Sequence, residues 1–282
     1  MYKIIILLLL IIPTISSNVN AFEIYGFIPW HMQKGNTLIK NQDEVKKNLA
    51  LWGLQRIDVI YHNRMLTNGH VDSNKIKKIA INSQNHPEIP ISFDLEIGNR
   101  NKPETVLPTL LKIINLYHTY DGKAPIGVYA TLPQNTFGGS KLTTKRKQQL
   151  IKLNKQYEII ANKIDFISPV LYFYDGEDLN SWKKSVDFNL DQSKILAAKY
   201  NLKIYPYITN SFRMSQKNKK TGGWMIELLN QKQMYHVLTY LDQKGANGAI
   251  IWASSQVIDR SGSRLLITTN SPWVQGIKNF IK

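Results

Sequence analysis

Runs of mostly apolar residues, each five to seven long, alternate along this chain with longer segments in which apolar residues recur at helical spacing. Short apolar runs predict buried strands, and longer amphipathic segments predict helices. We expect strands at 22–28, 57–61, 90–98, 125–130, 166–172, 203–207 and 248–252. We expect helices at 41–52, 73–84, 105–120, 144–162, 181–200, 226–244 and 272–281.

The order of these elements predicts an α/β fold. Strands that alternate with helices, without strand-to-strand hairpins, pair in parallel through crossover helices. We count seven such units and expect a TIM-like (β/α) barrel of about seven parallel strands, in a single domain that covers residues 22–282. An open doubly wound sheet is the rival arrangement, but no Gly-x-Gly-x-x-Gly turn follows the first strand.

The first 21 residues have the pattern of a secretory signal peptide. Lys3 precedes an apolar run from Ile4 to Ile12, and Val19-Asn20-Ala21 supplies a small-x-small exit before Phe22. The apolar run is too short to span a bilayer comfortably. We therefore expect cleavage near Ala21, a secreted or periplasmic protein, and no membrane span in the mature chain.

The chain contains no cysteine, so an exported domain of this kind is held together by its core and not by disulfides. Lysine and arginine number 36 against 20 acidic residues, a formal net charge of +16. This excess favours anionic partners, namely nucleic acid, anionic polysaccharide or an anionic envelope surface. The lysines are dispersed and no nucleic-acid motif accompanies them, so we expect no nucleic-acid partner. A purely solubilising role for the positive charge stays open. As to oligomeric state, we expect a monomer.

Two carboxylates, Asp94 and Glu96, stand at the C-terminal end of the third predicted strand. Side chains two residues apart on a strand project from the same face, so the pair shares one site. Two carboxylates held close together do not both ionise easily, and the one with the raised pKa becomes a general acid. Glycosidic bond cleavage needs such an acid. The structural alternative, in which the pair caps the following helix or meets an arginine, stays open.

Other predicted strands end in aromatic side chains. In a barrel, the active site is assembled from the carboxyl ends of the strands. The aromatic residues at those ends are Tyr61, Tyr129, Tyr172, Tyr207 and Trp252. Their rings are candidates for stacking on a sugar, whereas most of the 14 tyrosines are expected to pack the barrel.

Motifs for other chemistries are missing from the sequence. The six histidines show no His-Glu-x-x-His or His-x-His spacing, and the absence of cysteine excludes thiol catalysis. No Gly-x-Ser-x-Gly elbow is present, and the Gly-Gly pairs lack the lysine of a phosphate-binding loop. We therefore expect no metal and no cofactor.

Taken together and in order, the strand ends resemble the hyaluronidase family of glycoside hydrolases, from about Phe22 to the C-terminus. The stretch 60–64, Ile-Tyr-His-Asn-Arg, is similar to a family strand that ends in tyrosine before an Asp-Arg pair. The stretch 92–96, Ser-Phe-Asp-Leu-Glu, is similar to the family's Asp-Trp-Glu catalytic strand. Further matches follow at 127–133, 168–172, 206–207 and 245–252. The resemblance implies a distorted barrel with seven strands.

The resemblance also implies a role for each matched residue. Glu96 would be the proton donor, and Asp94 would orient the substrate's 2-acetamido group as that group attacks the anomeric carbon. Such a substrate-assisted route needs no enzymatic nucleophile, and it occurs in other acetamido-sugar hydrolases. Tyr207 would help to hold the acetamido group, Tyr61 would lie near the cleaved bond, and Trp252 would form the floor under the sugar.

The chain departs from the family pattern at two places. The family's Asp-Trp-Glu-x-Trp-Arg becomes Asp-Leu-Glu-Ile-Gly-Asn at 94–99, which removes an arginine unless Arg100 takes its place. The family's Pro-Asp-Cys-Tyr becomes Pro-Gln-Asn-Thr at 133–136, which removes a pocket tyrosine and a cysteine. These changes bear on substrate identity more than on reaction type.

These observations lead to one expected function and two alternatives. We expect an exported retaining endo-glycosidase that cleaves β-linked N-acetylhexosamine polysaccharide by substrate-assisted acid-base catalysis. The positive charge favours hyaluronan or a chondroitin-like chain over peptidoglycan or chitin. The alternatives are a muramidase-like peptidoglycan hydrolase, whose barrel also carries an Asp-x-Glu strand, and a sugar-binding barrel without activity.

Overall fold

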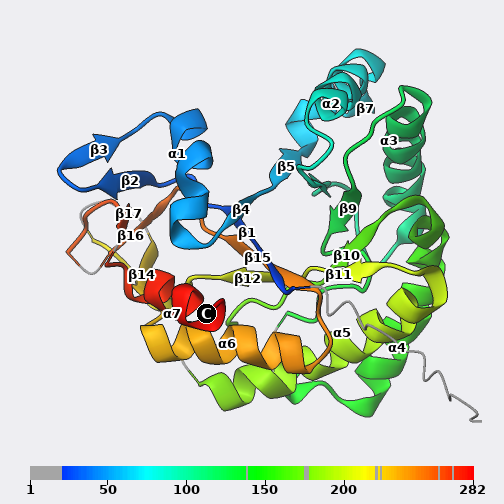
Figure 1. Ribbon diagram of the computed structural model, residues 1–282. Helices are drawn as coiled ribbons and strands as arrows, with labels where there is room; N and C mark the ends of the chain where they lie inside the picture. The colour runs from blue at the N-terminus through cyan, green and yellow to red at the C-terminus, as the bar shows by residue number, and fades with distance from the viewer. Residues whose placement is uncertain are drawn as a thin grey trace, which may run out of the picture.

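The computed structural model describes residues 21–137, 139–174, 178–219, 222, 224–259, 261–268 and 270–282. The predicted signal peptide therefore lies outside the described residues, apart from Ala21. Strands and helices alternate along most of the chain, and the strands occupy the centre with helices on the outside (Figure 1).

Parallel strands form the centre of the molecule, as the sequence predicts. They make two sheets, with the strand orders β12-β15-β1-β4 and β11-β10-β9-β8-β5. Every neighbouring pair in both sheets is parallel. The strands are β1 (Glu23–Phe27), β4 (Gln55–Arg56), β5 (Asp58–Tyr61), β8 (Ile91–Asp94), β9 (Ile126–Tyr129), β10 (Phe166–Ser168), β11 (Lys203–Ile204), β12 (Tyr207–Thr209) and β15 (Gly248–Trp252).

The two parallel sheets share two stretches of chain. Only Ile57 separates β4 from β5, and only Tyr205 and Pro206 separate β11 from β12. Because two pairs of strands are consecutive in this way, nine strands come from seven chain segments, the number predicted. β1 pairs with β4 and β5 pairs with β8, so the hydrogen bonding forms two sheets instead of one continuous ring.

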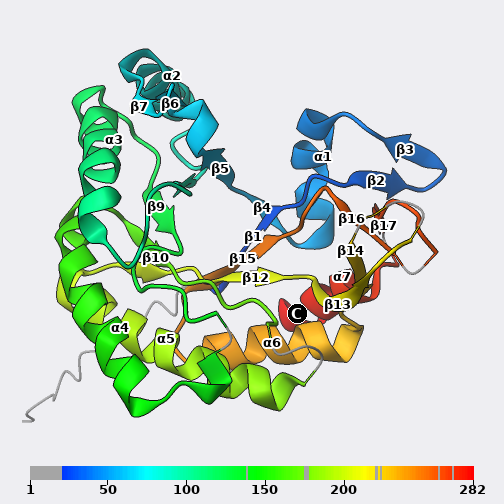
Figure 2. The ribbon, with the colours of Figure 1, turned by 180° about the vertical axis from the view of Figure 1, so that it is seen from behind.

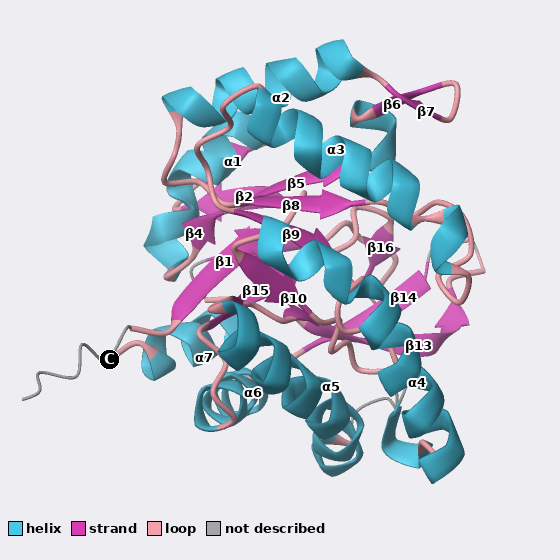
Figure 3. Ribbon diagram, turned by 90° about the vertical axis from the view of Figure 1, so that its right-hand side faces the viewer, coloured by secondary structure: helices cyan, strands magenta, loops and turns pink. Residues whose placement is uncertain are grey.

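In the part of the chain that the structure describes, seven α-helices connect and cover these strands. They are α1 (Gln42–Asn48), α2 (Ser73–Asn85), α3 (Leu107–Thr119), α4 (Thr144–Tyr157), α5 (Leu179–Tyr200), α6 (Gln231–Gln243) and α7 (Pro272–Phe280). Figure 3 shows α2 and α3 on one side of the strands and α5, α6 and α7 on the opposite side. Short 3-10 helices occur at η1 (Leu49–Trp52), η2 (His62–Arg64), η3 (Pro103–Thr105), η4 (Gly139–Lys141) and η5 (Glu158–Lys163).

Polar side chains define where several helices begin. The Asn41 side chain accepts hydrogen bonds from two backbone N–H groups of α1, and Asp72 does the same for α2. Asn230 and Gln233 form a reciprocal capping box at the start of α6. The predicted helix over 226–244 is wrong in its first turn, because the chain is still extended there and the helix starts only after the Asn230 cap.

Three antiparallel hairpins among the described residues correct the prediction that no such hairpins occur. The first joins β2 (His31–Lys34) to β3 (Thr37–Ile39) beside β17 (Leu266–Thr268). The second joins β6 (Leu66–Thr67) to β7 (His70–Val71), and the third joins β13 (Ser211–Lys217) to β14 (Trp224–Leu228) beside β16 (Val257–Ile258). The first and third lie at the same side of the molecule (Figures 1 and 2). All three are local excursions between units of the parallel core, and short polar strands carry little hydrophobic signal.

The buried apolar residues form two clusters. The larger one lies where helices pack on strands, and it contains Phe93 and Leu95. The smaller one has residues that alternate with the first along the same strands, as expected for the opposite face of each strand. We call it the inner cluster, and it consists of Tyr25, Ile57, Val59, Ala130, Phe166, Val170, Tyr205, Tyr207 and Ile250. Gly127 makes room for Phe166, because a Cβ there would lie 2.3 Å from the phenyl ring.

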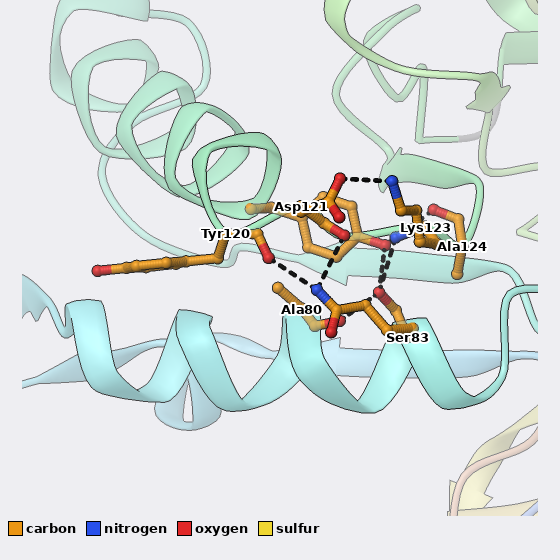
Figure 4. Close-up of polar contacts among 8 residues, drawn as sticks. Ala80, Ser83, Tyr120, Asp121, Lys123 and Ala124 are labelled. Atoms are coloured by element: carbon orange, nitrogen blue, oxygen red, sulfur yellow. Dashed lines mark hydrogen bonds and ion pairs between the residues drawn. The ribbon is translucent and has the colours of Figure 1, made fainter.

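A polar joint fastens α2 to the end of α3 and to the segment that enters β9 (Figure 4). The buried Ser83 hydroxyl donates to the Ala80 carbonyl at 2.6 Å and accepts from the Lys123 N–H at 3.0 Å. The Tyr117 hydroxyl lies 2.9 Å from Ser83 Oγ and donates to the Ala124 carbonyl at 2.9 Å. A joint in which each polar group has a partner fixes the helices beside β8.

Among the described helices, none combines the length and apolar character needed to cross a membrane.

Candidate active site

Asp94 is the last residue of strand β8, and Glu96 follows in the loop. The strand predicted over 90–98 is therefore shorter than expected, because Gly98 turns the chain with φ +64°. A Cβ at Gly98 would lie 2.6 Å from the Thr105 carbonyl oxygen, so the turn requires glycine. Phe93 and Leu95 point into the larger apolar cluster. Asp94 and Glu96 consequently share the other side of the chain, as the spacing predicts.

The two carboxylates have different surroundings. Asp94 is 6% exposed, whereas Glu96 is exposed to solvent. Burial first, and then the charge of Glu96, raise the pKa of Asp94 to about 7 against the opposing charge of Arg100. Asp94 Oδ1 has no hydrogen-bond partner among the described residues. Asp94 is thus the buried carboxyl that titrates near neutral pH, and one of its oxygens is left to accept a bond from a bound molecule.

Two tyrosines lie beside Asp94, the half-buried Tyr129 and the buried Tyr207. The Tyr129 and Tyr207 rings meet edge to face, with centroids 4.9 Å apart. Burial raises the pKa of both phenols above the ordinary value of 10, and the charge of Asp94 raises both further. A hydrogen bond joins Tyr129 to Tyr172, and the Ser92 hydroxyl lies close enough to lower the pKa of Tyr207. Both phenols therefore stay protonated at neutral pH and are neutral hydrogen-bond donors.

Trp252 forms an aromatic wall with two tyrosines. Its indole ring stacks on Tyr172 at 5.7 Å with an interplanar angle of 22°. Its Nε1–H donates to the Tyr61 hydroxyl at 3.2 Å. The charges of Asp94 and Glu96 contribute to the raised pKa of Tyr61, so this wall borders the acid pair. Flat, partly exposed rings beside carboxylates suit the apolar face of a sugar.

Arg100 lies beside Tyr129 and Asp94. Its Nη1 donates to the Ala130 carbonyl at 2.7 Å, and its guanidinium lies 5.7 Å from the centre of the Tyr129 ring. Ala130 has φ +53°, a left-handed conformation that alanine rarely adopts and that occurs here directly after β9. The charge of Arg100 lowers the pKa of Asp94, so the cation lies close to that carboxyl.

The structure brings the eight residues predicted for the site together, but Tyr207 begins β12 and does not end a strand as predicted. Asp94 and Glu96 come from β8 and its loop, and the others surround them on neighbouring segments: Tyr61, Arg100, Tyr129, Tyr172, Tyr207 and Trp252. Sequence reasoning missed Ser92 and Tyr174. Both lie two residues from a predicted site residue, so the period-two rule that placed Asp94 and Glu96 together was the available signal.

Two cavities lie along β5, and neither is lined by Asp94 or Glu96. One, of about 550 Å³, is lined by five cationic side chains and lies between α1, β5 and α2. We call it the basic groove, and its cations are Lys46, Arg56, Arg64, Lys75 and Lys78. The second, of about 220 Å³, shares Lys46, Asp58 and Arg64 with the first and reaches Tyr61. The chemistry of the side chains, and not cavity size, therefore identifies the candidate active site.

No protein-family model matches the sequence, and neither does any curated protein. Among solved structures, the chain is similar to β-D-glucuronidase from Dictyoglomus thermophilum, at 16% identity and a TM-score of 0.53, over 93% of this chain and 50% of that one. It is also similar to the Bacillus cereus spore cortex-lytic enzyme SleL, at 9% identity and a TM-score of 0.50, over 93% of this chain and 74% of that one. The alignment with bee venom hyaluronidase covers 83% of this chain and 79% of that chain at 13% identity, with a TM-score of 0.43, too low to support an inference. At these identities the likeness concerns the fold alone, which this chain shares with those two proteins.

Proposed function

We propose that this protein is an exported retaining endo-glycosidase that cleaves β-linked N-acetylhexosamine polysaccharide. Residues 22–282 would form one domain, a distorted barrel of seven strands related to the hyaluronidases. The observation that carries the proposal is the buried Asp94, with a pKa of about 7 and an unpartnered oxygen, beside the exposed Glu96. A structural carboxylate would have its oxygens satisfied, so the capping alternative explains neither feature.

The proposed reaction assigns different tasks to the two carboxyls. The raised pKa belongs to Asp94, so the expectation that it marks the general acid does not hold here, and the role of Glu96 follows from the resemblance and from its accessibility. Glu96 donates a proton to the glycosidic oxygen as the bond from that oxygen to the anomeric carbon breaks. The carbonyl oxygen of the substrate's 2-acetamido group forms the new bond to the anomeric carbon from the opposite face. Asp94 accepts the acetamido N–H on its unpartnered oxygen and stabilises the positive charge that develops there. Water then opens the cyclic intermediate with Glu96 as base, so that the configuration is retained.

The neighbouring side chains suit this reaction. Tyr207 is fully buried and neutral, so its hydroxyl is suited to donate a hydrogen bond to the acetamido carbonyl. Trp252 and Tyr172 supply the stacked surface on which the sugar would lie. Arg100 opposes the effect of burial on Asp94, and so keeps part of the Asp94 population charged at neutral pH.

The basic groove favours an anionic polymer over a neutral one. Within the described part of the chain, no carboxylate lies within ion-pair distance of Arg64, Lys75 or Lys78, whereas Arg56 is paired with Asp58 at 3.1 Å. The groove adjoins the cavity that reaches Tyr61. Hyaluronan or a chondroitin-like chain therefore fits this surface better than chitin does.

The charge argument predicts a local effect of one lysine. Lys78→Glu should weaken binding of hyaluronan fragments by about fivefold at low salt, because it reverses an unpaired charge in the groove. The difference should fade as salt rises, since screening acts over about 10 Å at 0.1 M. Lys152→Glu, an exposed position on α4, changes the net charge equally and is the control. Equal losses in both variants, or an equal salt response with neutral chitin oligomers, would contradict the assignment.

The test of the function itself is Glu96→Gln, assayed by counting reducing ends released from hyaluronan, chondroitin, chitin oligomers and peptidoglycan. The amide keeps size and hydrogen bonding but removes the proton, so the rate should fall at least about 100-fold. Glu88→Gln is the matched control, because Glu88 is exposed near the opposite end of β8. Near-normal turnover in Glu96→Gln would remove Glu96 from the mechanism. Cleavage of peptidoglycan alone would favour the muramidase-like alternative, and no turnover by the native protein would favour a binding barrel.

A further inference from the structure

Two aromatic rings extend the wall of the candidate active site into solvent. Phe137 is 72% exposed and Tyr174 is 44% exposed, and their ring centres lie 6.0 Å apart. Tyr174 in turn lies 6.0 Å from Tyr172, which stacks on Trp252 at 5.7 Å. The four rings form a row that begins beside the acid pair and ends at Phe137. We call Phe137 and Tyr174 the aromatic platform.

A single buried side chain fixes both rings of the platform. Asn135 is 7% exposed, and its Nδ2 donates to the Tyr174 hydroxyl at 3.0 Å. Its Oδ1 accepts from the Phe137 N–H at 2.9 Å. An apolar ring that packing alone controlled would turn inward, whereas here buried polar groups hold the backbone of an exposed ring in place.

The backbone at Phe137 is itself unusual. Its φ is +48°, in the left-handed region that a residue with a bulky side chain rarely adopts. A strained backbone that places a large apolar ring in water has no stabilising function of its own, and such positions occur at ligand sites. The platform therefore has the features of a binding surface.

The position of the platform relative to the acid pair indicates what would bind. The charge of Arg100 lowers the pKa of Tyr174 against the effect of burial, and the same guanidinium lies close to Asp94. Beyond a sugar on Trp252 and Tyr172, the row of rings thus continues through Tyr174 to Phe137, on the side where Arg100 lies. The row is also longer than a single pyranose. Its exposed members present apolar faces and a phenol, which match the C–H face and a hydroxyl of a sugar ring.

We propose that the aromatic platform is a distal sugar-binding site, which holds the apolar face of a pyranose in a polysaccharide chain beyond the unit that is cleaved. The direction of the chain relative to the cleaved bond rests on the proposed function, whereas binding at the platform does not. The site takes its ligand by stacking, so a neutral chain and an anionic chain bind there alike. Asn135 is a positioning residue for both rings.

The experiment measures oligosaccharide binding by calorimetry in the Glu96→Gln background, with chitin oligomers and hyaluronan fragments of two to ten sugars. The affinity of the Glu96→Gln parent, with the platform intact, should rise with chain length. Phe137→Ala should weaken binding of the long oligomers by about 10-fold and leave disaccharides unchanged, because one stacking contact is lost. Phe137→Trp should restore the long-chain affinity. Salt should not alter the difference between the variants, unlike at the basic groove.

Tyr235→Ala is the matched control, because Tyr235 on α6 is also 44% exposed and also has an aromatic neighbour, Phe280 at 6.5 Å. It should bind every oligomer as the native protein does. The platform is overturned if the Glu96→Gln parent binds long and short chains equally. It is also overturned if Phe137→Ala leaves long-chain affinity unchanged. If the native protein cleaves nothing and Phe137→Ala still loses long-chain affinity, the proposed glycosidase fails and the platform stands. If the native protein cleaves long chains and Phe137→Ala leaves their affinity unchanged, the proposed glycosidase stands and the platform fails.

Discussion

Two carboxylates at opposite ends of the parallel strands have contrasting environments. Glu23 begins β1 and accepts hydrogen bonds from Tyr25 at 3.1 Å, from Lys203 at 3.0 Å and from Tyr205. Asp94 ends β8, and its Oδ1 has no partner among the described residues. Both lie near tyrosines, but Lys203 is the charged neighbour of Glu23, whereas Glu96 and Arg100 are those of Asp94. The two positions therefore differ in hydrogen bonds and in neighbouring charge.

The pKa values follow this difference. Burial acts to raise the pKa of Glu23, but the bonds from Tyr205 and Lys203 outweigh it and the net pKa is lowered. Burial and the charge of Glu96 raise the pKa of Asp94 to about 7 despite the charge of Arg100, and no described donor bonds to Oδ1. A satisfied carboxylate stabilises the fold, whereas an unsatisfied buried one costs stability and is retained for its chemistry. The amino ends of barrel strands serve stability and the carboxyl ends serve catalysis, which agrees with this reading.

The largest expected effect is on the rate of Asp94→Asn. Loss of a carboxylate that stabilises developing charge should raise the barrier by about 2.7–4 kcal/mol, roughly 100- to 1,000-fold in kcat. Glu23→Gln should leave kcat unchanged, because Glu23 lies at the far end of the strands. Steady-state kinetics on the best polymer of the substrate panel measures both.

A thiazoline that mimics the cyclised acetamido intermediate tests the same residue from another side. It should inhibit the native protein strongly, since it resembles the charge-developing state. Covalent attachment of a fluorosugar to Asp94, or rapid cleavage of a polymer without 2-acetamido groups, would contradict the assisted route. Either result would favour the muramidase-like alternative.

The next effect is on stability, and its pH dependence should differ in sign between the two positions. The folded pKa of Glu23 is lowered, so its stabilisation is present above the unfolded value of 4.5 and is lost as pH falls through the folded pKa. Glu23→Gln should cost about 1.5–3 kcal/mol of unfolding free energy at pH 7, and less in acid. The folded pKa of Asp94 is raised, so its stabilisation is present below 3.8 and is lost as pH rises to about 7. Asp94→Asn should therefore gain stability relative to the native protein between pH 4 and pH 8.

Urea unfolding at pH 4, 6 and 8 measures these differences. The native protein and both variants would be compared at each pH, with the slope against urea used to check that one transition is being compared. Parallel pH curves for the two variants would contradict the contrast, because they would mean that both carboxylates have equivalent environments.

The smallest expected effect sharpens the comparison to two tyrosines that are two residues apart. Tyr205 donates to Glu23, whereas Tyr207 lies near Asp94 and Ser92. Tyr205→Phe should lower stability by about 1.5 kcal/mol with unchanged kcat, because a bond to a charged group is lost. Tyr207→Phe should reduce kcat by about tenfold and change stability less, because it removes a donor to the substrate. Thermal unfolding and kinetics together check the pair, and exchanged effects would refute the assignment of the two ends.

Part of the site was predictable because it depends on local geometry. The two-residue period of a strand placed Asp94 and Glu96 on one side, and the parallel order placed Tyr61, Tyr129 and Trp252 at the same end. Two predictions were wrong: the first turn of the helix at 226–244, and the absence of strand-to-strand hairpins. Short strands between the main units have little periodic signal. The resemblance led us to expect a lost pocket tyrosine at 133–136, and nothing in that motif indicated that Asn135 would hold Tyr174.

The sequence by itself therefore determined the parallel α/β order, the shared face of the acid pair and the excess of positive charge, because each depends on spacing or composition. Only the tertiary structure decided which carboxyl has the raised pKa, because burial and missing donors come from segments far apart in the chain. It also decided that Glu23 is satisfied by Lys203 and Tyr205, about 180 residues away. Asn135 likewise meets Tyr174 only after two loops fold against each other. Long-range packing sets the dielectric and the hydrogen-bond partners of a polar group, and no local pattern encodes either.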